Sequence, residues 1–459
     1  MILPRRTNYI CPKKAASKRN RRRSLRLQML ESRQLMAASI EPPATGPGTV
    51  TADITNLSAP IIAQNPGVLN AVADDGRSDV ESIQAAVDWL AMQLEDPSID
   101  VATLFLPAGT YHIDQSIVID AGISIVGEGM DQSVLTHTSD YEFTGRDVTD
   151  KEVQANAVNE AGYLLNLGKN ADGTIVRDIA LKGPSALGGL FAFDADELEV
   201  RNTRFESFVW SGLRTFNIDD FQVSDNVFVD AGGRKVRDDG SLGATGGGIF
   251  ATFTADADVA NNRFELTDEA GVNYFGIKGR KWTDSRIHHN TIGTNFSIEL
   301  PFENDAGVEI DHNDLSGVVS VPKFAGGPDL ALGESFHIHH NYFKTSYAIE
   351  GARNGLIVDS NVFEFDINQD GGNLFANFGS TEVTGSLSFT NNLVVNPGRG
   401  LMFNNGVQND FTFANNLVIG NQTINPRTEG MLGVRTSDNQ GNEVDFSTWQ
   451  VVDNMFEFN

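Results

Sequence analysis

Two similar segments, residues 285–301 and 336–351, place histidines, an asparagine and a glutamate at matching spacings. The first reads SRIHHNTIGTNFSIELP and the second FHIHHNYFKTSYAIEG, so that Glu299 and Glu350 each follow the asparagine by nine residues. A pair of carboxylates can serve as general acid and general base, whereas imidazoles can bind a transition metal. The matching spacing predicts a repeated structural unit that positions both kinds of side chain.

The two segments belong to a longer series of repeats. An apolar residue, two variable residues, asparagine, one variable residue and an apolar residue recur along residues 223–456. Side chains at one bend of successive coils can hydrogen-bond along a stack, and asparagine tolerates the left-handed backbone of a bend. We therefore interpret the aligned asparagines as structural. They are Asn226, Asn262, Asn290, Asn313, Asn341, Asn361, Asn392, Asn416 and Asn454, with Thr203 one repeat earlier.

A second strand can be aligned in each repeat, and its alternation assigns side chains to two faces. The inward positions are predicted to be Leu190, Leu213, Ile249, Ile277, Ile298, Val321, Ile349, Leu374, Leu401 and Met431. The preceding residue is small in nearly every repeat, as in Gly189, Gly212, Gly248, Gly276 and Ser297. Because alternation predicts that these small residues point outward, they indicate a surface that a ligand can approach closely.

The next outward column is predicted to combine aromatic and charged residues, namely Phe191, Arg214, Phe250, Lys278, Glu299, Pro322, Glu350, Phe375 and Met402. Aromatic rings pack on the apolar faces of sugars, and charged groups bind hydroxyls or uronate carboxylates, so we expect a groove for a polymeric glycan. Alternatively, a loop or a second subunit covers this face. The expected substrate-binding residues are Phe191, Arg214, Phe250, Gly276, Ser297, Tyr347 and Phe375.

Glu299 and Glu350 lie two repeats apart in this column. At the spacing of parallel strands their backbones would be about 9.6 Å apart, near the upper end of the carboxylate separation in inverting glycoside hydrolases. Lys278 lies one repeat before Glu299, so an ion pair is the structural interpretation of both residues.

Elimination from a uronate is the other catalytic hypothesis. It needs a base and a cation that neutralises the substrate carboxylate, and the candidates are Lys278, Arg280, Lys323 and Arg353. Basic residues in an otherwise acidic chain favour a polysaccharide lyase that acts on an anionic glycan. Hydrolysis by the two glutamates is the first alternative, and a non-catalytic glycan-binding or cell-surface structural protein is the second.

None of these hypotheses requires a cofactor, but calcium is a candidate. Asp238 and Asp239, in the segment RKVRDDG at 234–240, offer carboxylates that could ligate it. Acid pairs in loops are also common as solvated turns.

The histidines fall on a different strand of the repeat. Outward positions two residues before the asparagines include His288, Asp311 and His339, which could form a transition-metal site. Opposite charges alternate between neighbouring strands, and a structural charge ladder is therefore the preferred interpretation. Positions four before the asparagines continue the ladder with Arg286, Glu309 and His337, while His289, His312 and His340 adjoin the bend.

The N-terminal residues differ from the rest in charge. Residues 1–38 hold eleven Lys and Arg and one acidic residue, Glu31, which leaves 23 basic and 60 acidic residues in the remainder. A strongly acidic body excludes a nucleic-acid partner, since phosphate would be repelled. No apolar run is long enough for a membrane span. The one cysteine, Cys11, lies in the basic segment, so the remainder has no disulfide.

Residues 30–35, Leu-Glu-Ser-Arg-Gln-Leu, resemble the core of the N-terminal export segment of many secreted planctomycete proteins. The resemblance implies that residues 1–38 are removed and that the protein is secreted or held at a bacterial cell surface. Residues 39–69 are rich in Pro, Gly, Ser and Thr and are predicted to be a linker.

Folded sequence is predicted from residue 70 onward. An apolar spacing of Ile83, Ala86, Val87 and Leu90 predicts an amphipathic helix that begins near Ser78 or Asp79. This helix and the strands after it resemble the opening of the pectate-lyase-like superfamily, in which a short helix caps a right-handed parallel β-helix. The resemblance is carried by Asp74, Asp75, Gly76, Ile83, Gln84, Ala85, Pro107, Ala108, Gly109, Thr110 and Tyr111.

Taken with the repeats, the resemblance implies an all-β domain over residues 70–459. We expect a right-handed, single-stranded parallel β-helix of about ten or more coils with an N-terminal capping helix. The superfamily contains lyases, hydrolases, epimerases and non-enzymes, so the fold implies a polymeric glycan as partner without deciding the reaction.

Overall fold

The structure is a computed structural model that describes residues 46–138, 162–184, 186–232, 235–236, 242–243, 246–267, 274–300, 307–321, 336–345, 347–350, 355–365, 373–376, 386–396, 401–404, 410–420, 432–434 and 447–458. The chain divides into Met1–Ser39 and Ile40–Asn459, and the described residues all belong to the second unit. In these residues no helix combines the length and the apolar character that crossing a membrane requires.

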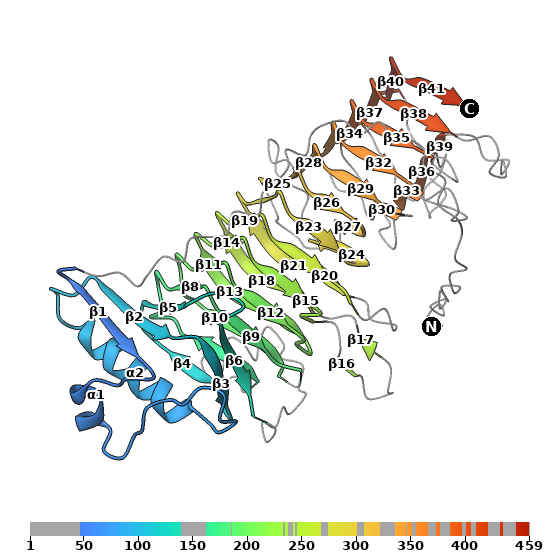
Figure 1. Cartoon of the computed structure of the whole chain (residues 1–459). Helices are drawn as coiled ribbons and strands as arrows, with labels where there is room; N and C mark the ends of the chain where they lie inside the picture. Colours follow the sequence, from blue (N-terminus) through green and yellow to red (C-terminus); the bar gives the residue numbers. More distant parts are fainter. Residues whose placement is uncertain are drawn as a thin grey trace, which may run out of the picture. The chain divides into compact units, whose positions relative to one another are not determined.

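Three long parallel sheets form the second unit, and successive strands of the chain pass from sheet 1 to sheet 3 to sheet 2 (Figure 1). Sheet 1 contains β1 (Thr49–Asp53), β2 (Val101–Leu106), β5 (Ile123–Gly127), β8 (Ile175–Arg177), β11 (Glu199–Arg201), β14 (Gln222–Ser224), β19 (Asp258–Ala260), β22 (Arg286–His288), β25 (Val308–Asp311), β28 (Phe336–His339), β31 (Leu356–Asp359), β34 (Ser386–Thr390), β37 (Asp410–Ala414) and β40 (Gln450–Val452).

Sheet 2 contains β4 (Ile117–Ile119), β7 (Tyr163–Leu167), β10 (Gly188–Phe193), β13 (Ser211–Asp219), β18 (Gly247–Ala255), β21 (Phe275–Thr283), β24 (Phe296–Glu299), β27 (Val318–Ser320), β30 (Tyr347–Glu350), β33 (Asn373–Ala376), β36 (Leu401–Asn404) and β39 (Leu432–Val434). Sheet 3 contains β3 (Gly109–Ile113), β6 (Ser133–His137), β9 (Ala180–Lys182), β12 (Arg204–Glu206), β15 (Val227–Val229), β20 (Arg263–Glu265), β23 (Thr291–Gly293), β26 (Asp314–Leu315), β29 (Tyr342–Lys344), β32 (Val362–Glu364), β35 (Leu393–Val395), β38 (Leu417–Gly420) and β41 (Met455–Phe458).

A short antiparallel pair, β16 (Lys235–Val236) and β17 (Leu242–Gly243), stands apart from these sheets. Every other pair of neighbouring strands is parallel, each sheet takes one strand from each coil, and the fold is the predicted right-handed parallel β-helix. The number of strands in the sheets, between 12 and 14, confirms the expectation of ten or more coils.

The core consists of apolar columns, because each short strand places one or two side chains toward the axis. In sheet 3 the rings of Phe205, Phe228 and Phe264 stack with centroids 4.8 and 4.7 Å apart. Leu190, Leu213, Ile249, Ile277 and Ile298 form the matching column of sheet 2 and are fully buried. Stacking of similar side chains, coil on coil, therefore stabilises the helix.

The asparagine ladder is present as predicted. The Oδ1 of each asparagine accepts hydrogen bonds from the backbone N–H and the side-chain amide of the asparagine one coil earlier, at 2.8–3.2 Å. Thr203 joins it through its N–H, which donates to Asn226. The left-handed backbone, however, belongs to the residue before each asparagine, such as Asn261, His289 and His340. The expectation that the ladder asparagines themselves are left-handed is wrong.

Substituting Asn341 by alanine should lower the free energy of unfolding by about 1 to 3 kcal/mol, because buried groups lose their partners. The Asn341 Oδ1 accepts from the N–H and amide of Asn313, and its own amide donates to Ile310 O at 2.8 Å. Denaturant unfolding measures the change. The matched comparison is Asn454→Ala at the partly exposed last rung, where a smaller loss is expected. Equal stability of Asn341→Ala and wild type would contradict the role of the ladder.

The predicted capping helix is α2 (Val80–Gln93), which begins after Asp79 and buries Ile83, Val87 and Leu90. It packs against β1, β2 and β4, the first strands of sheets 1 and 2 (Figure 1). The predicted linker at 39–69 is wrong where the structure describes it. β1 pairs in parallel with β2, and α1 (Ala59–Gln64) follows it, with Ile54 and Ile61 fully buried. A few apolar residues among Pro, Gly and Ser are sufficient to attach this segment to the core.

Candidate functional site

The outward column of sheet 2 has the predicted register as far as Glu299. Phe191, Arg214, Phe250, Lys278 and Glu299 are successive partners on β10, β13, β18, β21 and β24. An irregularity between Phe296 and Ile298 then changes the register by one residue, and β27 contributes residues two positions earlier than those predicted.

Because of that shift, Ser320 rather than Pro322 lies between the two glutamates, and Val319 rather than Val321 pairs with Ile298. Ile349 pairs with Phe375, so the partner of Glu350 is Ala376. The placement of Phe375 in the outward column is therefore wrong. Glu299 and Glu350 nevertheless remain two coils apart in one column, as predicted.

Lys278 and Glu299 form the expected ion pair, with Nζ 2.9 Å from Oε1. Their side chains keep 11% and 18% of their exposure, so solvent reaches this ion pair only in part. The Lys278 ammonium also lies over the Phe275 ring, 4.4 Å from its centroid. Arg280, two residues along β21, is half-buried. A carboxylate and two cations therefore lie near one another on the outer face, all of them largely or half buried.

Farther along the same face, the aromatic residues are buried. Phe191, Arg214 and Phe250 retain 1%, 1% and 4% of their exposure, and the two phenylalanines belong to a second apolar cluster outside the main core. The Arg214 guanidinium lies over Phe250 at 4.1 Å and donates to Thr252 Oγ1 at 2.8 Å. These three side chains are not presented to a sugar chain, and the alternative prediction of a covered face describes them better.

The small residues of sheet 2 do not form the floor of a groove. A Cβ on Gly276 would come within 2.5 Å of Ile292 Cγ2, a core atom of sheet 3. The same construction at Gly189, Gly212 and Gly248 meets the rings of the core phenylalanines of sheet 3. Ser297 is fully buried and accepts from the N–H of Gly317 at 3.0 Å. The assignment of Gly276 and Ser297 to substrate binding is wrong, because the corner between sheets 3 and 2 turns this position inward.

Replacing Gly276 by alanine is accordingly expected to destabilise the fold by about 1 to 3 kcal/mol through overpacking. Gly293, on the neighbouring coil segment β23, is the control, since a Cβ there meets only Phe264 O at 3.3 Å. Gly293→Ala should change stability by about 0.5 kcal/mol or less. Denaturant midpoints of the two variants make the comparison, and equal midpoints would refute the inward placement.

Several predicted residues cannot be placed. Lys323, Arg353, Asp238 and Asp239 lie outside the described residues. Tyr347 and Glu350 are placed by the backbone of β30 alone, with Tyr347 opposite Asn373 and Glu350 opposite Ser320.

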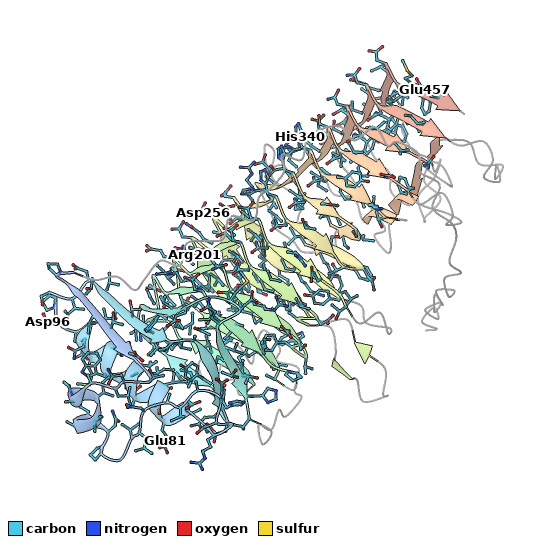
Figure 2. The ribbon with its side chains drawn as sticks, viewed as in Figure 1. Glu81, Asp96, Arg201, Asp256, His340 and Glu457 are labelled. Carbon is cyan, nitrogen blue, oxygen red and sulfur yellow. The ribbon has the colours of Figure 1, made fainter. Side chains whose placement is uncertain are left out.

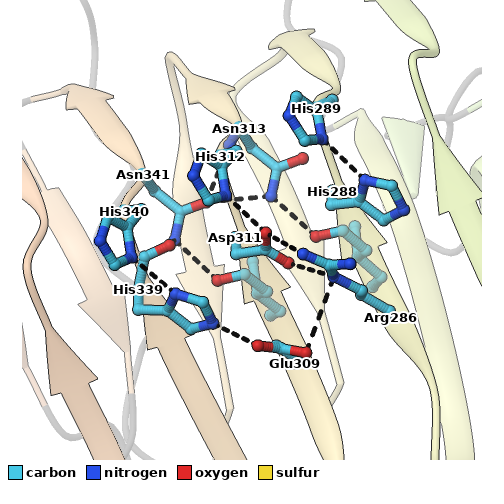
Figure 3. A network of polar contacts seen from close by, with 12 residues as sticks. Arg286, His288, His289, Glu309, Asp311, His312, Asn313, His339, His340 and Asn341 are labelled. Atoms are coloured by element: carbon cyan, nitrogen blue, oxygen red, sulfur yellow. Dashed lines mark hydrogen bonds and ion pairs between the residues drawn. The ribbon is translucent and has the colours of Figure 1, made fainter. Parts of the chain in front are cut away.

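A second group of chemistry-bearing residues lies on sheet 1. His340 marks this side of the molecule in Figure 2, and Figure 3 shows the surrounding network. His288, Asp311 and His339 are register partners, as predicted. They do not converge on one point, however. Asp311 accepts from Arg286 Nε at 2.8 Å and Nη2 at 2.7 Å, and His288 Nε2 is 2.7 Å from Asp258 Oδ1.

The carboxyl group of Asp311 has a strongly shifted pKa. Burial raises the pKa of its carboxyl, but hydrogen bonds from Arg286 and His312 outweigh burial and lower the pKa to about 2. Since both carboxylate oxygens are engaged by the guanidinium, the predicted metal site of His288, Asp311 and His339 is wrong. The predicted charge ladder is confirmed by the Arg286 contact with Glu309 at 3.6 Å.

The histidines at the bend form a stack of their own. The His312 ring is parallel to those of His289 and His340, with centroids 5.0 and 5.1 Å away. Burial lowers the pKa of His340, and the neighbouring His339 and His312 lower it further. Burial and His339 likewise lower the pKa of His337. Clustered imidazoles on this surface therefore favour the neutral form at these two positions.

The structure brings together Glu309 and His337, which the sequence had assigned only to the ladder, with His339, which had been assigned to a different metal site. Glu309, His337 and His339 each offer one ligand atom, and these atoms lie within 4.8 Å of one another. The alignment already placed Glu309 and His337 in one column, four residues before the asparagines. His337 and His339, two apart on β28, share a face, as the outward assignment of both positions implied.

Comparison with known proteins supports the fold. A family model described as rhamnogalacturonase A/epimerase, pectate lyase-like, matches residues 68–180. No curated protein sequence matches the chain. Among solved structures, a tailspike mutant of E. coli bacteriophage HK620 in complex with pentasaccharide has a TM-score of 0.53 at 11% identity, over 76% of this chain and 64% of that chain.

Two further structures are similar. A double mutant of the same tailspike protein has a TM-score of 0.51 at 12% identity, with 76% of this chain and 64% of that chain covered. The catalytic domain of a GH87 alpha-1,3-glucanase in complex with tetrasaccharides has a TM-score of 0.49 at 12% identity, over 85% of this chain and 68% of that chain. The chain thus spans 64% of the tailspike chains that it matches, and the likeness is one of fold.

Proposed function

We propose that this chain binds a polymeric glycan across β21, β24, β27 and β30 of sheet 2 and cleaves it. The proposal starts from its fold, the right-handed parallel β-helix of the pectate-lyase-like superfamily. The observation that carries the proposal is the column of Lys278, Glu299, Ser320 and Glu350 on those strands. It places two glutamates two coils apart in one column, with Lys278 paired to Glu299 and both of these side chains partly reached by solvent.

The spacing of the glutamates supports hydrolysis with inversion. Two strand spacings separate the Glu299 and Glu350 backbones by about 9.6 Å, and inverting enzymes hold their carboxyl groups roughly 6.5 to 9.5 Å apart. One carboxylic acid would protonate the glycosidic oxygen as the C–O bond breaks. The other, as carboxylate, would take a proton from the water that attacks the anomeric carbon from the opposite side.

The ion pair gives its two members different roles. Under hydrolysis Glu299 would be one of the two catalytic carboxyl groups, and Lys278, with Nζ 2.9 Å from Glu299 Oε1, would hold it in position. Lys278, with Arg280 two residues along the strand, would bind anionic or hydroxyl groups of the sugar.

Elimination is the second candidate, favoured by the two neighbouring cations Lys278 and Arg280 in a strongly acidic chain. In that reaction Arg280 would neutralise a uronate carboxylate, and Lys278, once deprotonated, would remove the adjacent proton. The electron pair of the broken C–H bond forms the C=C bond as the bond to the leaving oxygen breaks, and that oxygen takes a proton from water. The complex of the tailspike with a pentasaccharide supports glycan binding for this fold without distinguishing the reactions. Glycan binding without cleavage is the third outcome of the test.

Incubation of the protein with a panel of uronate and neutral polysaccharides tests the proposal. Hydrolysis predicts new reducing ends without ultraviolet absorbance, whereas elimination adds the absorbance of a conjugated enoate near 235 nm, roughly. Binding without either signal would refute cleavage. Neither binding nor products on any member of the panel would remove the proposal as a whole.

Export is also part of the proposal. It is supported by the basic composition of residues 1–38 and by the sequence at 30–35, which lie outside the described residues. Fractionation of cells that express the full chain tests it, because an exported protein is recovered outside the cytoplasm and shortened at its N-terminus.

A further inference from the structure

Six of the eight histidines of the chain gather on a small area of sheet 1 and its adjoining bend, and all but His337 are labelled in Figure 3. They lie on or directly after β22, β25 and β28, and contacts between rings link them in pairs. The charge ladder accounts for the acidic and basic residues here, but it does not explain such a concentration of imidazoles. These histidines are His288, His289, His312, His337, His339 and His340.

Three side chains of this area converge. Glu309 on β25 is the register partner of His337 on β28, and His339 follows His337 on the same face of the strand. One potential ligand atom from each lies within 4.8 Å of the other two. The His339 Nε2 is already 2.5 Å from Glu309 Oε1, and the rings of His337 and His339 have centroids 4.1 Å apart.

One ring nitrogen of His337 is buried without a hydrogen-bond partner. Among the described residues, nothing donates to or accepts from its Nε2 atom. A buried imidazole nitrogen without a partner costs free energy, and such exceptions in a folded protein call for an explanation. A metal ion accepting the lone pair of that nitrogen would provide one.

We propose that Glu309, His337 and His339 bind one divalent transition-metal ion, with Zn²⁺ as the best match. Two imidazole nitrogens and one carboxylate oxygen form a donor set that zinc uses in proteins, and three protein ligands leave a position for water. Calcium and magnesium prefer oxygen ligands throughout, so the two imidazoles select against them.

The surroundings are suited to holding the ligands. His339 Nδ1 lies 2.8 Å from His340 Nδ1, so His340 can accept a hydrogen bond there and leave the Nε2 of His339 for the metal. Such outer partners fix the tautomer and orientation of metal-binding histidines. The second oxygen of Glu309 is 3.6 Å from Arg286, which restrains the carboxylate.

The charge of the surrounding side chains also favours the binding of a divalent cation. Glu309 and Asp311 on β25 and Asp359 on β31, the two strands that flank β28, contribute carboxylates to this surface, opposed by the Arg286 guanidinium. Their summed charge is negative, so a bound cation would reduce repulsion rather than increase it. The metal would join β25 to β28 and hence one coil to the next.

Calorimetric titration of the chelator-treated full chain with Zn²⁺ tests the proposal. One equivalent should bind, and the His337→Ala variant should bind at least about tenfold more weakly. The matched control is His288→Ala, which removes a histidine of the same surface that contacts Asp258 instead. Its affinity for Zn²⁺ should equal that of the wild type. A large excess of Ca²⁺ should not displace the zinc.

A second measurement distinguishes loss of the metal site from loss of folding. Co²⁺ added to the wild type should give visible absorption bands of low-symmetry coordination by nitrogen and oxygen, and His337→Gln should abolish them while its circular dichroism stays native. No binding by the wild type would overturn the proposal. So would equal weakening in His337→Ala and His288→Ala, since that result describes an adventitious ion on a histidine-rich surface.

Discussion

Replacing either Glu299 or Glu350 by glutamine should lower turnover on an active polysaccharide by about two to four powers of ten. The amide is isosteric with the carboxyl group but can neither give nor take the proton of the reaction. Substrate affinity should change little, because binding to a polymer is spread over several coils. Initial rates over a range of substrate concentrations separate turnover from affinity.

Controls on the same substrate distinguish the reaction classes. Glu265→Gln, on sheet 3 and paired with Arg263, should retain full turnover. Lys278→Ala should be the most damaging change if elimination is the reaction, whereas under hydrolysis it should mainly weaken binding of an anionic substrate. Full activity in Glu299→Gln, Glu350→Gln and Lys278→Ala would show that the reaction, if any, occurs elsewhere.

Replacing Asp311 by alanine is expected to cause a loss of about 2 to 3 kcal/mol in unfolding free energy at neutral pH. The carboxylate is fully buried, and its removal leaves Arg286 without its two shortest contacts. Arg286 is itself partly exposed and can recover water, which keeps the loss below that of a fully buried pair. Asp258→Asn, at an exposed carboxylate of the same sheet, is the control and should change stability by about 0.5 kcal/mol or less.

The same residue predicts a pH dependence. Since the folded protein lowers the pKa of Asp311 from 3.8 to about 2, the contribution of the carboxylate is present in full above pH 4, roughly, and is lost as the pH falls toward 2. The shift corresponds to about 2 kcal/mol. Unfolding in denaturant at pH 7 and pH 3, with chelator present, should therefore show a smaller loss on acidification in Asp311→Ala than in wild type. Identical losses would contradict the ion pair.

Much of the fold could be predicted because it is repeated. The asparagine ladder and the column from Phe191 to Glu299 depend on residues that recur once per coil, and errors in one repeat are corrected by the next. The alignment failed where the repetition is interrupted. Because of the register shift between β24 and β27, Ser320 occupies the position assigned to Pro322. No residue type in this segment indicates such a shift.

The candidate site was harder to predict, since alternation describes a straight strand. At Gly276 the chain has only just turned from sheet 3, and the position that alternation assigns to the surface faces Ile292 instead. Burial of Phe191 and Phe250 also depends on packing around the outer face, which repeats do not encode. The grouping of Glu309 with His337 and His339 required the distance between coils as well as the column.

The most direct test of the central claim is a crystal structure of the Glu299→Gln variant with an oligosaccharide from the polysaccharide that the protein binds best. The sugar should lie across β21, β24, β27 and β30, with one glycosidic oxygen between positions 299 and 350 and the Lys278 ammonium within hydrogen-bond distance of the chain. A sugar bound on sheet 1, on sheet 3 or away from these strands would contradict the proposed site.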